Sequence, residues 1–121
     1  MTKAKVIESF GFAAQGVVST FREGRNFKVQ LCFAVAAIAL GVAFSIDLTE
    51  WAIIAVCIGT VLGLECVNTA VEAVVDIASP QRSELAKLAK DSAAGAVLIA
   101  SVASLFVAAF LFLPRIVSIL V

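Results

Sequence analysis

Histidine is absent from the 121-residue sequence, and charged residues make up only 15% of it, against about 25% in soluble domains. The three cysteines, Cys32, Cys57 and Cys66, lie in apolar runs and form no CxxC or Cys/His spacing. This pattern argues against a disulfide framework and a zinc site, so the cysteines are interpreted as apolar filler. The sequence also contains no GxxxxGK[ST] and no GxGxxG, which excludes a P-loop and a Rossmann turn for any nucleotide that binds.

Hydrophobic residues make up 62% of the chain, whose formal net charge is zero and whose mean hydropathy is +1.09. The balanced charge gives no basic surface for nucleic acid, so no nucleic-acid partner is expected. Charged residues are missing altogether from three runs, 31–46, 51–64 and 92–113. The sequence therefore predicts a single domain over residues 1–121 with an all-α integral membrane fold.

Each apolar run, with its flanks, reaches the roughly 20 helical residues that a bilayer core requires. Transmembrane helices are predicted at about 27–46, 51–75 and 92–113. The short acidic segment 47–50 makes the first two an antiparallel hairpin. Pro114 and Arg115 are predicted to end the third helix, because proline cannot continue a helix and arginine prefers the membrane interface.

The segment before the first crossing, about 5–22, carries apolar residues at helical spacing together with basic residues. It is predicted to be an amphipathic helix in the membrane interface; the alternative is that it packs against the other helices as core. All basic residues except Arg115 precede the first crossing or lie between the second and the third. This bias predicts a cytoplasmic N-terminus and an external C-terminus.

Four polar side chains share one face of the second predicted crossing: Glu65, Asn68, Glu72 and Asp76 fall within an arc of roughly 80° at 100° per residue. Counted from Trp51 at about 1.5 Å per residue, the inner edge of a ~30 Å bilayer core is reached near Val71, so Glu65 lies just inside that edge and Glu72 at it. Polar groups at this depth are costly unless they are paired, hydrated or functional. Hydrogen bonds between helices are the alternative to a functional site. Glu65 and Glu72 lie about 10 Å apart along the axis and therefore need different roles. The deeper Glu65 suits a general base for a lipid-borne group, and Glu72 suits a hard-cation ligand that Asn68 helps to orient.

A second polar cluster, Lys87, Lys90 and Asp91, immediately precedes the third crossing, on a helix that Ser83 is predicted to cap. The predicted topology places it at the same membrane edge as Glu72, where a lysine beside a metal-binding carboxylate suits a polyphosphate. Taken alone, Lys90 also suits an interface anchor. A GxxxG at 59–63 is a signal for close helix packing within or between subunits, and a core of three crossings favours an oligomer with shared sites.

These segments resemble one known family. LECVNTAVEAVVDIASP at 64–80, followed by LAKLAKDSAAGAVLIA at 85–100, is similar to the signature of the small prokaryotic diacylglycerol kinases, which include undecaprenol kinases. The resemblance covers essentially the whole chain. RNF at 25–27, EW at 50–51 and FLPR at 112–115 look most like the undecaprenol kinase branch, with diacylglycerol kinase as the alternative.

The resemblance implies a homotrimeric kinase of the bacterial inner membrane that transfers the γ-phosphoryl group of ATP, with Mg²⁺, to a lipid alcohol. It implies Glu65 as general base and Glu72 as a metal ligand. The nucleotide-binding positions that it implies are Glu72, Asn68, Asp76, Lys90, Asp91 and Phe12, and the lipid-binding positions are Lys5, Asn26 and Phe27. The rival hypothesis is a non-enzymatic transporter or assembly subunit, but its polar path would cross the whole bilayer, whereas the outer halves of all three crossings lack ionisable residues.

One departure from the family pattern concerns the metal site. Gly24 stands where the family usually has a second metal-binding glutamate, and Glu23 lies one position earlier, about 100° away on a regular helix. Glu23 can substitute only if the backbone is irregular there, which a glycine makes easier. A relocated ligand, a weakened metal site and an inactive chain are the alternatives. Gln30 and Ser83 stand where relatives often carry histidine.

Overall fold

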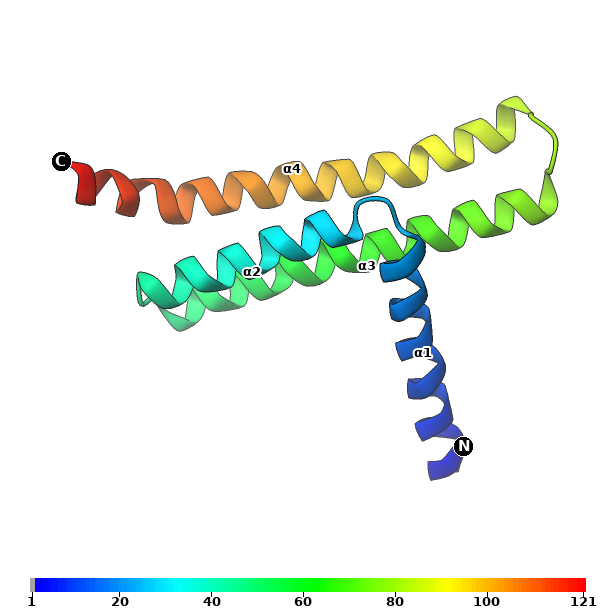
Figure 1. The fold of residues 1–121 in the computed structure, drawn as a ribbon, viewed down its shortest axis with the longest axis horizontal. Helices are drawn as coiled ribbons and strands as arrows, with labels where there is room; N and C mark the ends of the chain where they lie inside the picture. Colours follow the sequence, from blue (N-terminus) through cyan, green and yellow to red (C-terminus); the bar gives the residue numbers. More distant parts are fainter. Residues whose placement is uncertain (1) are drawn as a thin grey trace.

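A computed structural model of the chain describes residues 2–121 as four helices (Figure 1). They are α1 (Lys3–Glu23), α2 (Phe27–Ala43), α3 (Leu48–Ala78) and α4 (Glu84–Leu120). Helices α2, α3 and α4 run alongside one another, whereas α1 projects sideways from them and makes an angle of 104° with α2. The all-α prediction is confirmed.

Helices α3 and α4 are each long and apolar enough to cross a membrane. With 31 and 37 residues, they extend about 46 and 55 Å, well beyond a hydrocarbon core of about 30 Å. Helix α2 has 17 residues and is about 26 Å long. It is long enough to cross a membrane only together with α1, as a bent pair. The helices thus provide two membrane spans, or three if the bent pair counts as one.

The predicted hairpin between α2 and α3 is present, and a Schellman motif ends α2 there. The Ile46 amide donates to the carbonyl of Gly41 at 3.1 Å, and Ser45 adopts the left-handed conformation, with φ of 51°. Gly41 allows the returning helix to approach closely, because a Cβ there would lie 2.7 Å from Cη2 of Trp51. A capping box begins α3: Asp47 accepts from the Glu50 amide, and Glu50 accepts from the Asp47 amide.

The buried apolar core is small. Among the described residues, the apolar side chains classed as buried are Phe27, Ile46, Ile54, Val61, Val97 and Phe112. Ile46, Ile54 and Phe112 form one cluster at the hairpin end of the molecule. Many large apolar side chains on all four helices remain exposed. Because so little apolar surface is buried within the chain, lipid or other copies of the protein must cover the rest.

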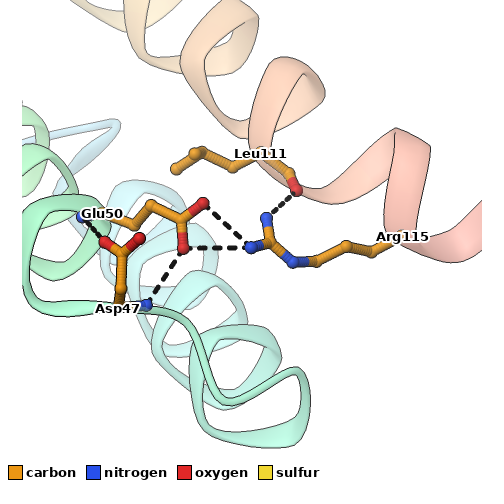
Figure 2. Close-up of polar contacts among 4 residues, drawn as sticks. All are labelled: Asp47, Glu50, Leu111 and Arg115. Carbon is orange, nitrogen blue, oxygen red and sulfur yellow. Dashed lines mark hydrogen bonds and ion pairs between the residues drawn. The ribbon is translucent and has the colours of Figure 1, made fainter.

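The prediction that Pro114 ends the last helix is wrong, since α4 continues through Pro114 to Leu120. Proline removes one backbone donor and crowds the preceding turn, but apolar helices tolerate this where other groups satisfy the carbonyls that it frees. Here the Nη1 atom of Arg115 donates to the carbonyl of Leu111, in the turn before Pro114, at 2.6 Å (Figure 2). The carbonyl that loses its helical donor to Pro114 is that of Phe110, four residues earlier. The bond from Arg115 therefore adds a contact in the same turn and does not replace the bond that the proline removes.

The same arginine connects α4 to the beginning of α3. Nη2 of Arg115 donates to both carboxylate oxygens of Glu50, at 2.9 and 3.0 Å (Figure 2). The two side chains are 34% and 18% exposed, respectively. Since Glu50 also accepts from the Asp47 amide at 3.0 Å, one carboxylate stabilises both the cap of α3 and the contact between α3 and α4.

We expect Glu50→Ala to lower the free energy of unfolding by about 2 kcal/mol. Half of this reflects the lost cap, and half reflects the charge-assisted hydrogen bonds to Arg115, discounted for partial exposure. Denaturant unfolding of the purified protein in detergent measures the change. Glu84→Ala, which removes the exposed first-turn glutamate of α4, is the matched control and should change stability by less than about 0.5 kcal/mol. Equal stability of the two variants would contradict the assignment.

Candidate active site

A cleft of about 400 Å³ lies between α2, α3 and α4. Apolar side chains from all three helices line most of its length, among them Phe33, Ile58, Val61, Val97 and Phe112. Its charged and amide side chains come from the α1–α2 connection, the first turn of α2 and the second half of α3: Arg25, Asn26, Gln30, Glu65, Asn68 and Glu72. From α4, the hydroxyl groups of Ser101 and Ser104 also line the cleft. The cleft therefore has the character of a site for an amphipathic molecule, with hydrocarbon along its walls and a polar group at one end.

Glu65 is the buried carboxylate of this cleft, with a relative exposure of 3%. Its Oε2 atom accepts a hydrogen bond from Nε2 of Gln30 at 3.2 Å. Local sequence does not predict this contact, because 35 positions separate the two residues. A carboxylate that lies at the boundary between polar and apolar walls is well placed to take a proton from a group carried by an apolar ligand.

Two buried acceptor atoms beside Glu65 lack a hydrogen-bond partner within the described part of the chain. They are Oε1 of Gln30 and Oδ1 of Asn68, and both residues line the cleft. Buried polar atoms are rarely left unpaired in folded proteins, so each acceptor indicates a donor that the isolated chain does not supply. A ligand hydroxyl group, together with water that accompanies it, provides such donors.

Glu72 lines the same cleft but is more exposed than Glu65, with 37% of its side chain accessible. Its Oε1 atom lies 3.5 Å from Nη2 of Arg25, which is itself 87% exposed. An ion pair this exposed contributes little to stability, so Glu72 is free to exchange Arg25 for another cation. The two glutamates thus differ in exposure within the chain: Glu65 is buried, and Glu72 is partly accessible.

Asp76 lies on the same helix but does not line the cleft. It accepts from Nζ of Lys90 on α4 at 2.6 Å, while Nζ of Lys87 donates to Asp91 at 2.6 Å. The hydrogen bond to Asp91 raises the pKa of Lys87. The contact between Asp76 and Lys90 confirms that the two predicted polar clusters lie at the same end of the molecule. Ser83 caps α4 as predicted, by accepting from the Ala86 amide at 3.0 Å.

The residues present fit a magnesium ion that arrives with phosphate groups rather than a self-contained metal cage. Within residues 2–121, no group of three or more acidic or cysteine side chains is close enough to hold a metal ion. Mg²⁺ commonly binds through one or two carboxylates, with substrate phosphates and water completing its shell. Glu72, which is solvent-accessible at the polar end of the cleft, has the chemistry of such a single protein ligand.

The backbone is irregular at Gly24, as the substitution of Glu23 for the missing ligand would require. Helix α1 ends at Glu23, and Gly24 adopts φ of −69° and ψ of 126°, which other residues also tolerate. The requirement for glycine is instead spatial, because a Cβ would lie 2.6 Å from the carbonyl oxygen of Thr20. Glu23 lines a different groove, between α1 and α3, beside Thr69 and Ala73. The structure therefore does not bring Glu23 into the cleft that Glu72 lines.

The remaining positions that the family resemblance implied lie in three different surroundings. Lys5 and Phe12 are on the projecting helix α1, where both are exposed. Asn26 lines the polar end of the cleft. Phe27 is 4% exposed and packs edge-on against Phe21, with ring centroids 6.1 Å apart. In this chain Phe27 thus belongs to the core, at the junction between α1 and α2.

Apolar helices of membrane length around a half-polar cleft that holds a buried carboxylate define the class of membrane-embedded enzymes that act on lipids. The sequence model of the prokaryotic diacylglycerol kinases matches residues 11–112. This chain belongs to that family and is a lipid kinase.

Three curated relatives support this membership. The chain is 38% identical to an undecaprenol kinase of Bacillus subtilis over 111 residues, which cover 92% of this chain and 90% of the relative. It is 39% identical to a diacylglycerol kinase of Synechocystis over 117 residues, covering 96% and 67% of the two chains. A diacylglycerol kinase of Haemophilus influenzae is 35% identical over 97 residues, covering 78% and 80%.

Gly24→Glu tests whether a carboxylate at position 24 strengthens Mg²⁺ binding. The added Cβ meets the Thr20 carbonyl, so we expect Gly24→Glu and Gly24→Ala both to lose about 1–3 kcal/mol of stability. Because Gly24 lines the cleft with Glu72, only Gly24→Glu adds a carboxylate near Glu72, and it should lower the Mg²⁺ concentration for half-maximal kinase activity. Magnesium titrations of the two variants measure this, and identical titrations would refute it.

Proposed function

We propose that the protein phosphorylates undecaprenol to undecaprenyl phosphate at the cytoplasmic interface of the membrane, with ATP as the phosphoryl donor and Mg²⁺ as cofactor. The observation that carries the proposal is the buried carboxylate of Glu65 at the polar end of an apolar cleft. Two buried acceptors beside it await donors. The site thus offers a proton acceptor where the hydroxyl end of a long hydrocarbon would lie.

In the proposed reaction, the lipid chain lies along the apolar walls and its hydroxyl group reaches Glu65. Glu65 accepts the hydroxyl proton while the oxygen attacks the γ-phosphorus, and the bond to ADP breaks. Glu72 would hold Mg²⁺ on the phosphates, and this ion would supply positive charge for the transferring group. Lys90 lies at the same end of the molecule and would exchange Asp76 for a phosphate oxygen.

Two observations favour undecaprenol as the acceptor. The RNF, EW and FLPR segments resemble the undecaprenol kinase branch. The curated undecaprenol kinase aligns with this chain over 90% of its own length. Diacylglycerol is the second candidate, because a diacylglycerol kinase is 39% identical to this chain.

We propose the orientation and the assembly on separate grounds. All basic residues except Arg115 lie either before α2 or in its first turn, or between α3 and the second turn of α4. This distribution favours a cytoplasmic N-terminus and α2 as a third crossing. Helix α1 projects sideways (Figure 1), and its large apolar side chains are exposed, as expected of an interfacial helix. The homotrimer follows from the family resemblance. Gly59 and Gly63 have open space beside them in the single chain, so the GxxxG is available for packing between copies.

A comparison of the two lipids tests the proposed substrate. The purified chain is assayed in mixed micelles with labelled ATP and Mg²⁺ on undecaprenol and on diacylglycerol at equal mole fractions. We expect kcat/KM for undecaprenol to exceed that for diacylglycerol at least tenfold. A higher kcat/KM on diacylglycerol would overturn the choice of substrate.

A further inference from the structure

Gln30 links the first turn of α2 to the buried carboxylate on α3. Its Nε2 atom donates to Oε2 of Glu65 at 3.2 Å. Within residues 2–121, the carboxylate of Glu65 accepts no other hydrogen bond from a side chain. Gln30 also lines the polar end of the cleft, and its own Oε1 atom is buried without a partner. The amide therefore donates to the carboxylate through Nε2, while its Oε1 atom has no hydrogen-bond donor within the described residues.

A carboxylate on a flexible side chain needs a partner that fixes its orientation if it is to take a proton from a defined position. The hydrogen bond from Gln30 engages one oxygen of Glu65, Oε2, which leaves Oε1 for a ligand. An amide is neutral and does not titrate, so it holds the carboxylate equally well at any pH at which the protein is folded. A carboxylate or an imidazole at position 30 would instead couple a second proton to Glu65.

We propose that Gln30 is a positioning residue for Glu65: it orients the carboxylate toward the acceptor hydroxyl group and keeps it free of a second titrating neighbour. This inference rests on the proposed role of Glu65 as general base. The charged residues that line the same cleft are Arg25 and Glu72, and α4 contributes no charged side chain to its lining. Arg25 and Glu72 pair with each other. The hydrogen-bond partner of the Glu65 carboxylate among residues 2–121 is Gln30.

Three substitutions at position 30 separate this role from a merely structural one. Gln30→Leu removes the donor and should lower kcat about tenfold, the effect of about 1.4 kcal/mol at the transition state, with the lipid KM within twofold of wild type. Gln30→Glu keeps the shape but places two carboxyl groups within hydrogen-bond distance, where they share one proton. The acidic limb of its kcat profile should move upward by at least one pH unit, with activity recovering at high pH. Gln30→His restores a donor and should retain kcat within about threefold of wild type above pH 7.

Gln15→Leu, the same substitution on the exposed surface of α1, controls for the change of side chain. The positioning role is overturned if Gln30→Leu and Gln15→Leu have equal kcat, or if the pH profile of Gln30→Glu matches that of wild type. A purely structural role would lower stability without moving the acidic limb. Glu65→Gln, assayed in parallel, separates failure of the proposed function from failure of this inference. Wild-type activity of Glu65→Gln would show that Glu65 is not the general base. An inactive Glu65→Gln, together with an unchanged pH profile of Gln30→Glu, would refute only the role of Gln30.

Discussion

Replacing Glu65 by glutamine should lower kcat for phosphoryl transfer by about 10²–10⁴-fold, which is the usual contribution of a general base. Glutamine has nearly the same shape, and it still offers an oxygen to Nε2 of Gln30, so the packing around the cleft should persist. The KM for the lipid should change little, because the variant loses proton acceptance and keeps the apolar walls. Initial rates of transfer from labelled ATP, measured over a range of lipid mole fractions, separate kcat from KM.

The matched control is Glu84→Gln, which makes the same substitution at an exposed residue in the first turn of α4. It should leave kcat within about twofold of wild type. Denaturant unfolding of both variants excludes a loss of folded protein, since burying an amide in place of a buried carboxylate should not destabilise the helix packing. Wild-type kcat in folded Glu65→Gln would show that another group accepts the proton.

The features that the sequence predicted best are those set by local rules. Ser83 caps α4 because a serine before an apolar, periodic segment satisfies the first amides. The order of Glu65 and Glu72 from buried to accessible follows from helix geometry and from their distance to the membrane edge. The spacing of Asp47 and Glu50 is also typical of the capping box that these residues form. From the sequence, this segment is interpreted only as a short acidic connection.

The features that the sequence could not provide depend on contacts between distant segments. The pairs Gln30–Glu65 and Glu50–Arg115 join residues 35 and 65 positions apart, so helix packing alone determines them. Asp76 shares a face with Glu65 in helix geometry, yet it turns to Lys90 because the beginning of α4 lies beside it. Pro114 is expected from its own propensity to end a helix, but α4 continues through it to Leu120.

The second large effect is expected for Glu72→Gln, which should lower kcat/KM for ATP in the presence of Mg²⁺ by about 10²–10³-fold, as expected when one group that stabilises transition-state charge is removed. Glu72 is the solvent-accessible carboxylate of the cleft, and no cluster of acids elsewhere in residues 2–121 offers a replacement. Because glutamine retains a neutral oxygen, excess Mg²⁺ should restore part of the rate. Initial rates over a matrix of ATP and Mg²⁺ concentrations measure both effects.

Glu23→Gln decides whether the missing ligand at position 24 has a substitute. Glu23 lines the groove between α1 and α3 rather than the cleft. We therefore expect the Mg²⁺ concentration for half-maximal activity of Glu23→Gln to stay within threefold of wild type, while that of Glu72→Gln rises much further. A matching rise in both variants would instead identify Glu23 as a second ligand, brought to Glu72 by movement of α1 about the bend at Gly24. The comparison thus separates a metal site with one protein carboxylate from a site that closes when α1 moves.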